Sequence, residues 1–110
     1  MVRILAVIHE QRAEDSRNDT RRPVDINASL RMAGARGIGC VLSNISLAGF
    51  MARSYARVEP GRPIWLRVPG FPALAARVIW SDDQRLGCQF ETPLSPEMLV
   101  RIVAEAPNLH

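Results

Sequence analysis

Six short apolar runs separated by turn-forming residues are the feature that most constrains the fold of this 110-residue chain. The first run alternates apolar with polar residues, the period-2 pattern of a strand with one buried face. Its apolar face would carry Val24, Ile26, Ala28, Leu30 and Met32. The other runs cover residues 38–45, 49–54, 63–68, 74–80 and 85–91. Because segments such as SLAG, VEPGRP and SDDQR divide them, an antiparallel sandwich or a small closed barrel is predicted.

The last run of the sequence has the signals of a helix instead. Ser95 is a candidate N-cap, Pro96 suits the first helical turn, and Glu97 suits the positive end of the helix dipole. Pro107 ends the pattern. Apolar residues recur at helical spacing and predict a packing face made of Met98, Leu99, Ile102 and Val103. The predicted fold is therefore all-β with one helix, a six-stranded antiparallel β-barrel with a C-terminal α-helix packed on or across it.

Length and composition indicate one ordinary globular domain. The chain is 47% apolar and 23% charged, and its formal net charge is +3. All 14 of its cationic side chains are arginines. The apolar N-terminal stretch, residues 1–8, is too short to span a membrane and is followed by no small-residue cleavage site. No membrane insertion and a cytoplasmic location are therefore predicted.

No enzymatic or metal-binding pattern occurs in the sequence. Cys40 and Cys88 lack metal-ligand spacing, and each lies in an apolar run, so both are predicted to be buried, reduced thiols. His9 and His110 lie near the termini, without a carboxylate or cysteine at catalytic or ligand spacing. The known nucleophile, zinc and phosphate-loop motifs are also missing. The protein is therefore predicted not to be an enzyme, and no catalytic or metal site is assigned.

The two tryptophans and a pair of adjacent aspartates have structural interpretations. Alternation within residues 74–80 places Trp80 on the same face as Val78. Trp65 and Trp80 are therefore predicted to pack in the core or at the end of the barrel rather than to form stacking surfaces. Asp82 and Asp83 lie between two runs and are predicted to form a hairpin turn.

Three arginines stand out in the polar segment that precedes the first run, HEQRAEDSRNDTRRPVD, residues 9–25. Arg17 and Arg21 are four residues apart, and Arg22 follows directly. One interpretation is a solvated arm with internal ion pairs between arginines and acids. The other is a clamp, because a guanidinium fork donates two parallel hydrogen bonds to guanine O6 and N7 or to two phosphate oxygens.

A second polar group interrupts the apolar pattern at VLSNISLAGFMA, residues 41–52. The simplest interpretation is a turn between two strands, since Asn, Ser and Gly are common turn residues. Alternatively, Asn44 offers an amide that can pair with a guanine edge, and Ser46 a hydroxyl for a phosphate or ribose oxygen. Gly49 would then allow a turn with positive φ or the close approach of a ligand to the backbone.

Taken together, the two groups resemble the motifs of the PilZ domain family. Arg17 and Arg21 match the family's R-x-x-x-R motif, and Asn44, Ser46 and Gly49 match its [D/N]-x-S-x-x-G motif. The resemblance covers residues 17–106, which leaves residues 1–16 as an N-terminal extension and residues 107–110 as a tail. It implies a PilZ-like split barrel that binds cyclic di-GMP. It also implies that the loop arginines grip guanine and phosphate while Asn44 and Ser46 read the ligand from the barrel face.

The resulting hypothesis is a cyclic di-GMP effector whose N-terminal arginine loop, with Arg17, Arg21 and the neighbouring Arg22, closes on the ligand and signals to an unidentified protein partner. No cofactor other than this ligand is expected, and a homodimer is a possible assembly. One alternative is a PilZ-like protein-interaction module without a ligand. Another is a small β-barrel that binds single-stranded nucleic acid through Arg31, Arg53 and Arg67. The aromatic content of 5% and the modest charge argue against this last function.

Overall fold

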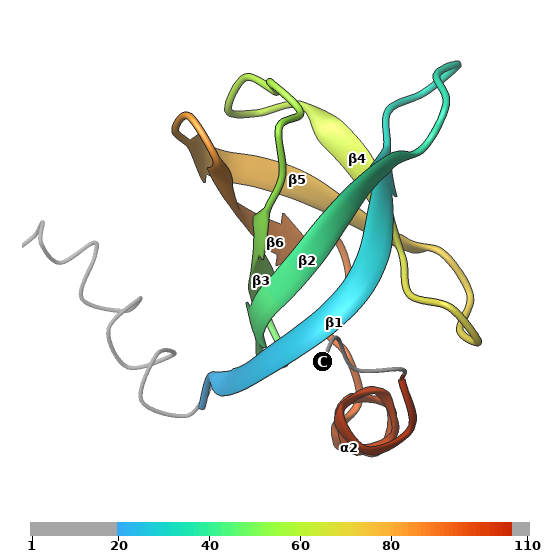
Figure 1. Cartoon of the computed structure of the whole chain (residues 1–110). Coiled ribbons are helices and arrows are strands. Elements are labelled where there is room, and N and C mark those ends of the chain that lie inside the picture. Colours follow the sequence, from blue (N-terminus) through green and yellow to red (C-terminus); the bar gives the residue numbers. More distant parts are fainter. Residues whose placement is uncertain (1–19, 107–110) are drawn as a thin grey trace, which may run out of the picture.

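A closed barrel of six antiparallel strands, with one helix after the last strand, forms the part of the chain that the computed structural model describes, residues 20–106 (Figure 1). The predicted extension, residues 1–16, the predicted tail, residues 107–110, and Arg17 lie outside the described residues. The elements are β1 (Arg22–Arg31), β2 (Ile38–Ile45), β3 (Gly49–Arg53), β4 (Pro63–Arg67), β5 (Leu74–Ser81), β6 (Arg85–Phe90) and α2 (Pro96–Glu105). The prediction of six antiparallel strands and a C-terminal helix is confirmed.

Pairing of the first strand on both sides decides between a sandwich and a barrel. The strand order is β1-β2-β3-β6-β5-β4, and every neighbouring pair is antiparallel. The sheet then closes because β1 also pairs with β4, with Leu30 opposite Leu66. Closure removes the exposed edges that an open sheet would present for unwanted strand pairing.

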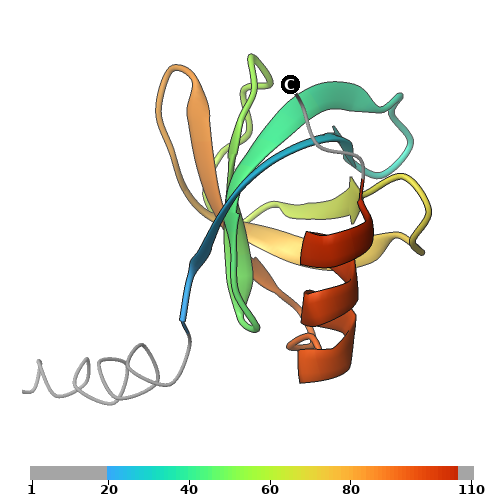
Figure 2. The ribbon, with the colours of Figure 1, turned by 60° about the horizontal axis from the view of Figure 1, so that its bottom comes forward.

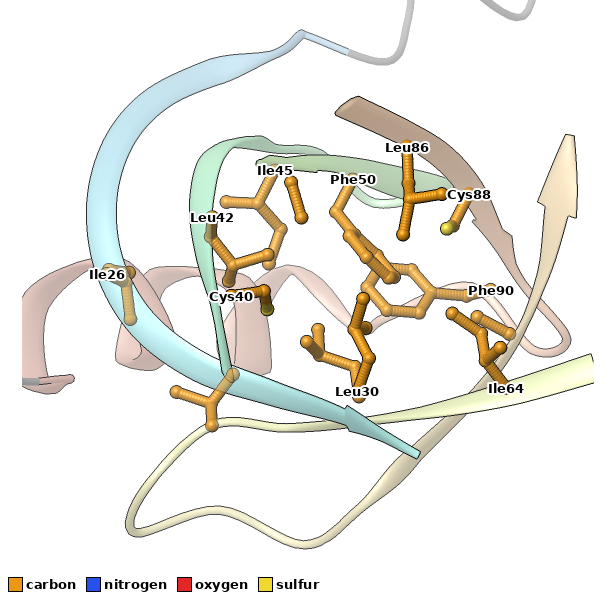
Figure 3. Close-up of a cluster of buried hydrophobic side chains, with 14 of the residues drawn as sticks. Ile26, Leu30, Cys40, Leu42, Ile45, Phe50, Ile64, Leu86, Cys88 and Phe90 are labelled. Carbon is orange, nitrogen blue, oxygen red and sulfur yellow. The ribbon is translucent and has the colours of Figure 1, made fainter. Parts of the chain in front are cut away.

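The barrel interior is filled by apolar side chains from all six strands (Figure 3). Phe50 and Phe90 lie near its centre, with ring centroids 5.4 Å apart and planes tilted by 43°. Ile26, Leu42 and Leu66 have no exposed surface, which agrees with the inward phase that the alternation predicts. The interior is thus a packed core, and it leaves the outer face and the barrel ends for function.

A bulge in β5 overturns the prediction for Trp80. Val78 pairs with Cys88 and faces the core, but the next pair is Trp80 with Gly87, so Ile79 is an extra residue. One inserted residue reverses the phase of alternation, which sends Trp80 to the outer face, where it is 41% exposed. The predicted packing of this tryptophan in the core or at the barrel end is therefore wrong.

Trp65 also departs from its predicted role. It lies between the inward-facing Ile64 and Leu66, so its side chain is on the outer face, where it is half-buried. The guanidinium of Arg31 lies 5.4 Å from its ring centroid, and that of Arg85 lies 5.9 Å from the ring centroid of Trp80. Both tryptophans are thus surface residues covered by arginines through cation–π contacts.

Helix α2 begins as the sequence predicts. The Ser95 hydroxyl accepts a hydrogen bond from the Met98 amide at 3.1 Å, and Pro96 occupies the first turn. Leu99 and Ile102 are buried and Met98 and Val103 are half-buried, so the predicted packing face is confirmed. The helix covers one end of the barrel (Figure 2). Neither α2 nor any other helix within residues 20–106 has the length and apolarity to cross a membrane.

Replacing Phe50 by Ala tests the packing of the barrel core. The side chain is 1% exposed, so its removal leaves a cavity that the surrounding strands cannot close. We expect a loss of about 3–5 kcal/mol in the free energy of unfolding, measured by urea denaturation. Val100→Ala, on the solvent side of α2 where Val100 is 53% exposed, is the control and should change it by about 0.5 kcal/mol at most. Equal effects of both substitutions would contradict this description of the core.

Candidate functional site

The two sequence motifs meet at the end of the barrel where the chain enters β1. The β2–β3 connection, residues 46–48, lies at this end together with α2, whereas the β1–β2, β3–β4 and β5–β6 connections lie at the other (Figure 1). Arg21 directly precedes β1, and β1 is hydrogen-bonded to β2 along its length. The fold therefore brings the second arginine of the arm beside the end of β2, where Asn44 lies.

A hydrogen bond joins the two motifs. The Arg21 Nη1 atom donates to Asn44 Oδ1 at 2.9 Å, across 23 positions of sequence. Both side chains are at the surface, and no acidic residue among the described ones forms an ion pair with Arg21 or Arg22. Because the bond is open to water, it contributes little to stability, and a ligand with suitable acceptors can replace it.

The register of β2 sets the direction of Asn44. Asn44 pairs with Pro23 on one side and Met51 on the other, while the next residue, Ile45, is buried in the core. Alternation then places the Asn44 amide on the outer face. Ser43 is an extra residue in the pairing with β3, and its hydroxyl donates to the Met51 carbonyl at 3.2 Å, which stabilises this bulge.

Ser46 and Gly49 close the turn between β2 and β3. The Ser46 amide donates to the Gly49 carbonyl at 2.8 Å, and the Gly49 amide donates to Ser46 Oγ at 3.2 Å. The Ser46 hydroxyl also lies 3.2 Å from the Gly49 carbonyl, to which it can donate. Ser46 has no exposed surface, so its hydroxyl serves the turn. Direct contact of Ser46 with a phosphate or ribose stays a prediction. In the structure, the hydrogen bonds of Ser46 with Gly49 stabilise the turn that follows the strand end carrying Asn44.

Gly49 is needed for a reason other than the two that the sequence suggested. Within residues 20–106 only Gly34, Gly61 and Gly70 have positive φ, so the turn does not need Gly49 for a left-handed conformation. Instead, a Cβ at this position would overlap the carbonyl oxygen of Cys88 on β6. The close approach is therefore that of a neighbouring strand, and the expectation of a positive φ at Gly49 is wrong.

The same turn is bonded to the segment that leads into α2. The Phe90 amide donates to the Ala48 carbonyl, and the Leu94 amide to the Leu47 carbonyl, both at 2.8 Å. Leu94 directly precedes Ser95, the N-cap of the helix. The strand end that carries Asn44 is thus fixed on one side by β1 and on the other by the start of α2.

One further surface residue lies in line with Asn44, and sequence reasoning missed it. Successive cross-strand pairs run from Asn44 to Met51, from Met51 to Gly87 and from Gly87 to Trp80. The indole of Trp80 occupies the space where a side chain at position 87 would lie. Since neighbouring strands are about 4.8 Å apart, the ring lies roughly 10 Å from Asn44 along the outer face. The sequence signal for this contact is Gly87, because a glycine within a strand leaves room for a neighbouring side chain, here the Trp80 indole.

The described residues offer no reactive group at this site. Cys40 and Cys88 are free and buried, as predicted, and burial raises the pKa of each to about 12, so neither is a thiolate near neutral pH. No cluster of three or more His, Cys, Asp or Glu side chains exists within residues 20–106 to hold a metal ion. The arrangement of Arg21, Asn44 and Trp80 offers hydrogen-bond donors and acceptors and a flat aromatic surface, which suit binding.

Comparison with known proteins adds no assignment. The sequence matches no protein-family model, and no curated protein shows significant similarity to it. The likeness to the PilZ family therefore rests on the two motifs quoted above.

Substituting Gly49 by Ala tests the packing of the turn on β6. The added methyl group would overlap the backbone of Cys88, which cannot rotate away as a side chain can. We expect a loss of about 1–3 kcal/mol or more in the free energy of unfolding, measured by denaturant titration. Gly39→Ala is the matched control, because a Cβ there meets no atom within 4 Å. A variant at position 49 as stable as the one at position 39 would contradict the close approach.

Proposed function

We propose that this protein is a receptor for cyclic di-GMP, a binding protein rather than an enzyme. The observation that carries the proposal is the hydrogen bond from Arg21 to Asn44 at 2.9 Å. It supports the proposal because the two residues come from separate motifs and meet on the outer surface, next to a turn that holds two further motif residues, Ser46 and Gly49.

Recognition of guanine follows from the chemistry of these side chains. A guanidinium donates to guanine O6 and N7 at once, and the Asn44 amide both donates and accepts. Arg17 and Arg21 also neutralise the two phosphates of the ligand through charge-assisted hydrogen bonds. In the proposed complex the ligand replaces the solvent-exposed Arg21–Asn44 bond, and the arm that carries Arg17 closes over it.

Trp80 supplies a stacking surface in this proposal. Its ring lies over Gly87 on β6, two strands from Asn44, and a base that stacks on it displaces the Arg85 guanidinium, which lies 5.9 Å from the ring centroid. Base–aromatic stacking contributes about 1–3 kcal/mol per base. A ligand with two bases can therefore place one at Arg21 and Asn44 and the other toward Trp80.

Single-stranded nucleic acid is the second candidate, because two surface tryptophans with stacked arginines are the elements of a base-stacking platform. Trp65 lies on β4, which contributes no residue to the row from Asn44 to Trp80, and it pairs with Arg31 on β1 and Ala75 on β5. A continuous track of bases would have to contact both tryptophans. A cyclic dinucleotide needs only the Trp80 side.

The first test compares cyclic di-GMP, cyclic di-AMP and a short single-stranded oligonucleotide by calorimetric titration. We expect micromolar or tighter binding of cyclic di-GMP alone, on the order of −8 kcal/mol. Adenine carries a donor where guanine has the O6 acceptor, so an arginine fork disfavours it. Equal affinity for both dinucleotides, or for neither, would refute the proposal, and preference for the oligonucleotide would establish the second candidate.

The second test is Arg21→Ala, measured with the same titration. Loss of a charge-assisted hydrogen bond costs about 1.5–3 kcal/mol, which is roughly a tenfold to hundredfold weaker affinity. Arg17→Ala should have an effect of the same order. Arg22→Ala is the matched comparison, since it removes the same charge one position away and outside the motif, and it should cost less affinity than Arg21→Ala. A larger loss from Arg22→Ala than from Arg21→Ala would show that the motif is assigned to the wrong register.

A further inference from the structure

A separate cleft lies at the opposite end of the barrel wall from the Arg21–Asn44 contact. It has a volume of about 600 Å³, within the range of about 300–1,000 Å³ that is typical of small-molecule sites. It lies where β2 and β3 cease to pair, beyond the last pair, Val41 with Arg53. Its polar lining comes from Asn27, Arg53, Ser54, Tyr55 and Gln84, and none of these residues belongs to the candidate site.

Hydrogen bonds fix the wall of this cleft. Ser54 Oγ donates to the Gly39 carbonyl at 3.2 Å and accepts from the Ala56 amide at 3.1 Å, while the Ser54 amide donates to the Gln84 carbonyl at 2.9 Å. Ser54 is 7% exposed, so these bonds are sheltered from water. They connect the start of β2, the end of β3 and the β5–β6 hairpin into one preformed wall.

The charges on the cleft are unbalanced. Arg53 and Arg85 pair directly across β3 and β6, an arrangement of like charges that destabilises a sheet. Arg85 is compensated by an ion pair with Asp82 at 3.0 Å. Hydrogen bonds from the Gln84 amide and from Arg85 hold the pKa of Asp82 below its usual value. The Asp82 carboxylate is therefore already paired with Arg85. No acidic residue in the described part of the chain forms an ion pair with Arg53.

We propose that this cleft is a second ligand site, for a small molecule that carries an oxyanion, phosphate or carboxylate, on a planar body. Arg53 binds the oxyanion with its two-pronged donor geometry. Tyr55, which is 84% exposed, presents an aromatic ring and a hydroxyl at the rim, and Asn27 and Gln84 offer amides. Cys40 also lines the cleft, and its thiol stays protonated because burial raises its pKa to about 12, so the site binds its ligand without covalent chemistry.

The test uses phenyl phosphate as the probe and follows the backbone amides of the full chain by heteronuclear NMR. We expect saturable shifts at Asn27, Val41, Arg53, Tyr55 and Gln84, with no shift at Asn44 or Gly49. Inorganic phosphate should bind more weakly, because it lacks the planar body that fills the cleft beside Tyr55. Binding of inorganic phosphate as tight as that of phenyl phosphate would overturn the proposal.

Two arginine variants distinguish binding of phenyl phosphate in the cleft from its nonspecific electrostatic attraction to surface arginines. Arg53→Gln should weaken phenyl phosphate binding roughly tenfold or more, since it removes a charge-assisted contact. Arg57→Gln, at an exposed position of the β3–β4 connection that does not line the cleft, should change the affinity about twofold at most. Tyr55→Ala should also weaken phenyl phosphate binding. Because Tyr55 is largely exposed, this variant should fold normally and gives an independent test of the cleft.

Three further results would overturn the second site. They are the absence of saturable shifts, shifts spread over all surface arginines, and equal losses from Arg53→Gln and Arg57→Gln. The result is independent of cyclic di-GMP binding, because the two sites share no residue.

Discussion

Pairing of β1 with β4 is the interaction on which the rest of the structure depends. It joins the first and fourth strands of the chain, with Leu30 opposite Leu66, and converts a six-stranded sheet into a tube with an inside and an outside. Once the sheet is closed, one face of each strand is sealed from water and the other is not. The alternation of each strand then determines which of its side chains are buried and which are exposed. Asn44, Arg53 and Trp65 are on the surface because an adjacent residue of the same strand, Ile45, Ala52 and Ile64 respectively, faces the core.

Within this frame, two β-bulges decide which polar and aromatic side chains reach the surface. An extra residue in β2, Ser43, lies directly before Asn44, and an extra residue in β5, Ile79, lies directly before Trp80. Bulges bend a strand and re-aim its side chains, and they are common next to functional sites. Here they stand at the two ends of one row of cross-strand pairs, so the outer face carries a polar end and an aromatic end on a rigid support.

Much of this could be predicted from the sequence, because period-2 alternation and turn residues report burial directly. The strand β2 and the cap of α2 at Ser95 agree with the predicted positions, and so do the buried thiols. The six-stranded barrel was predicted as well, but the pairing of β1 with β4 that closes it and the position of Trp80 could not be predicted. Closure depends on contact between strands far apart in sequence, and a bulge leaves no local signal in an apolar run such as ARVIW. The cleft beside Arg53 depends on where two strands diverge, which no single segment encodes.

The position of Gly49 against Cys88 affects how this protein can diverge during evolution. Any side chain at position 49 meets the backbone of β6, so selection for a stable fold alone preserves the glycine. Arg21 and Asn44 are exposed, and their mutual bond contributes little to stability, so they are preserved only while something binds them. Under the proposed function, a descendant that loses its ligand would keep the glycine and lose the other two. Among related proteins, the presence of both Arg21 and Asn44, and not that of Gly49, would therefore distinguish those that bind the ligand from those that no longer do.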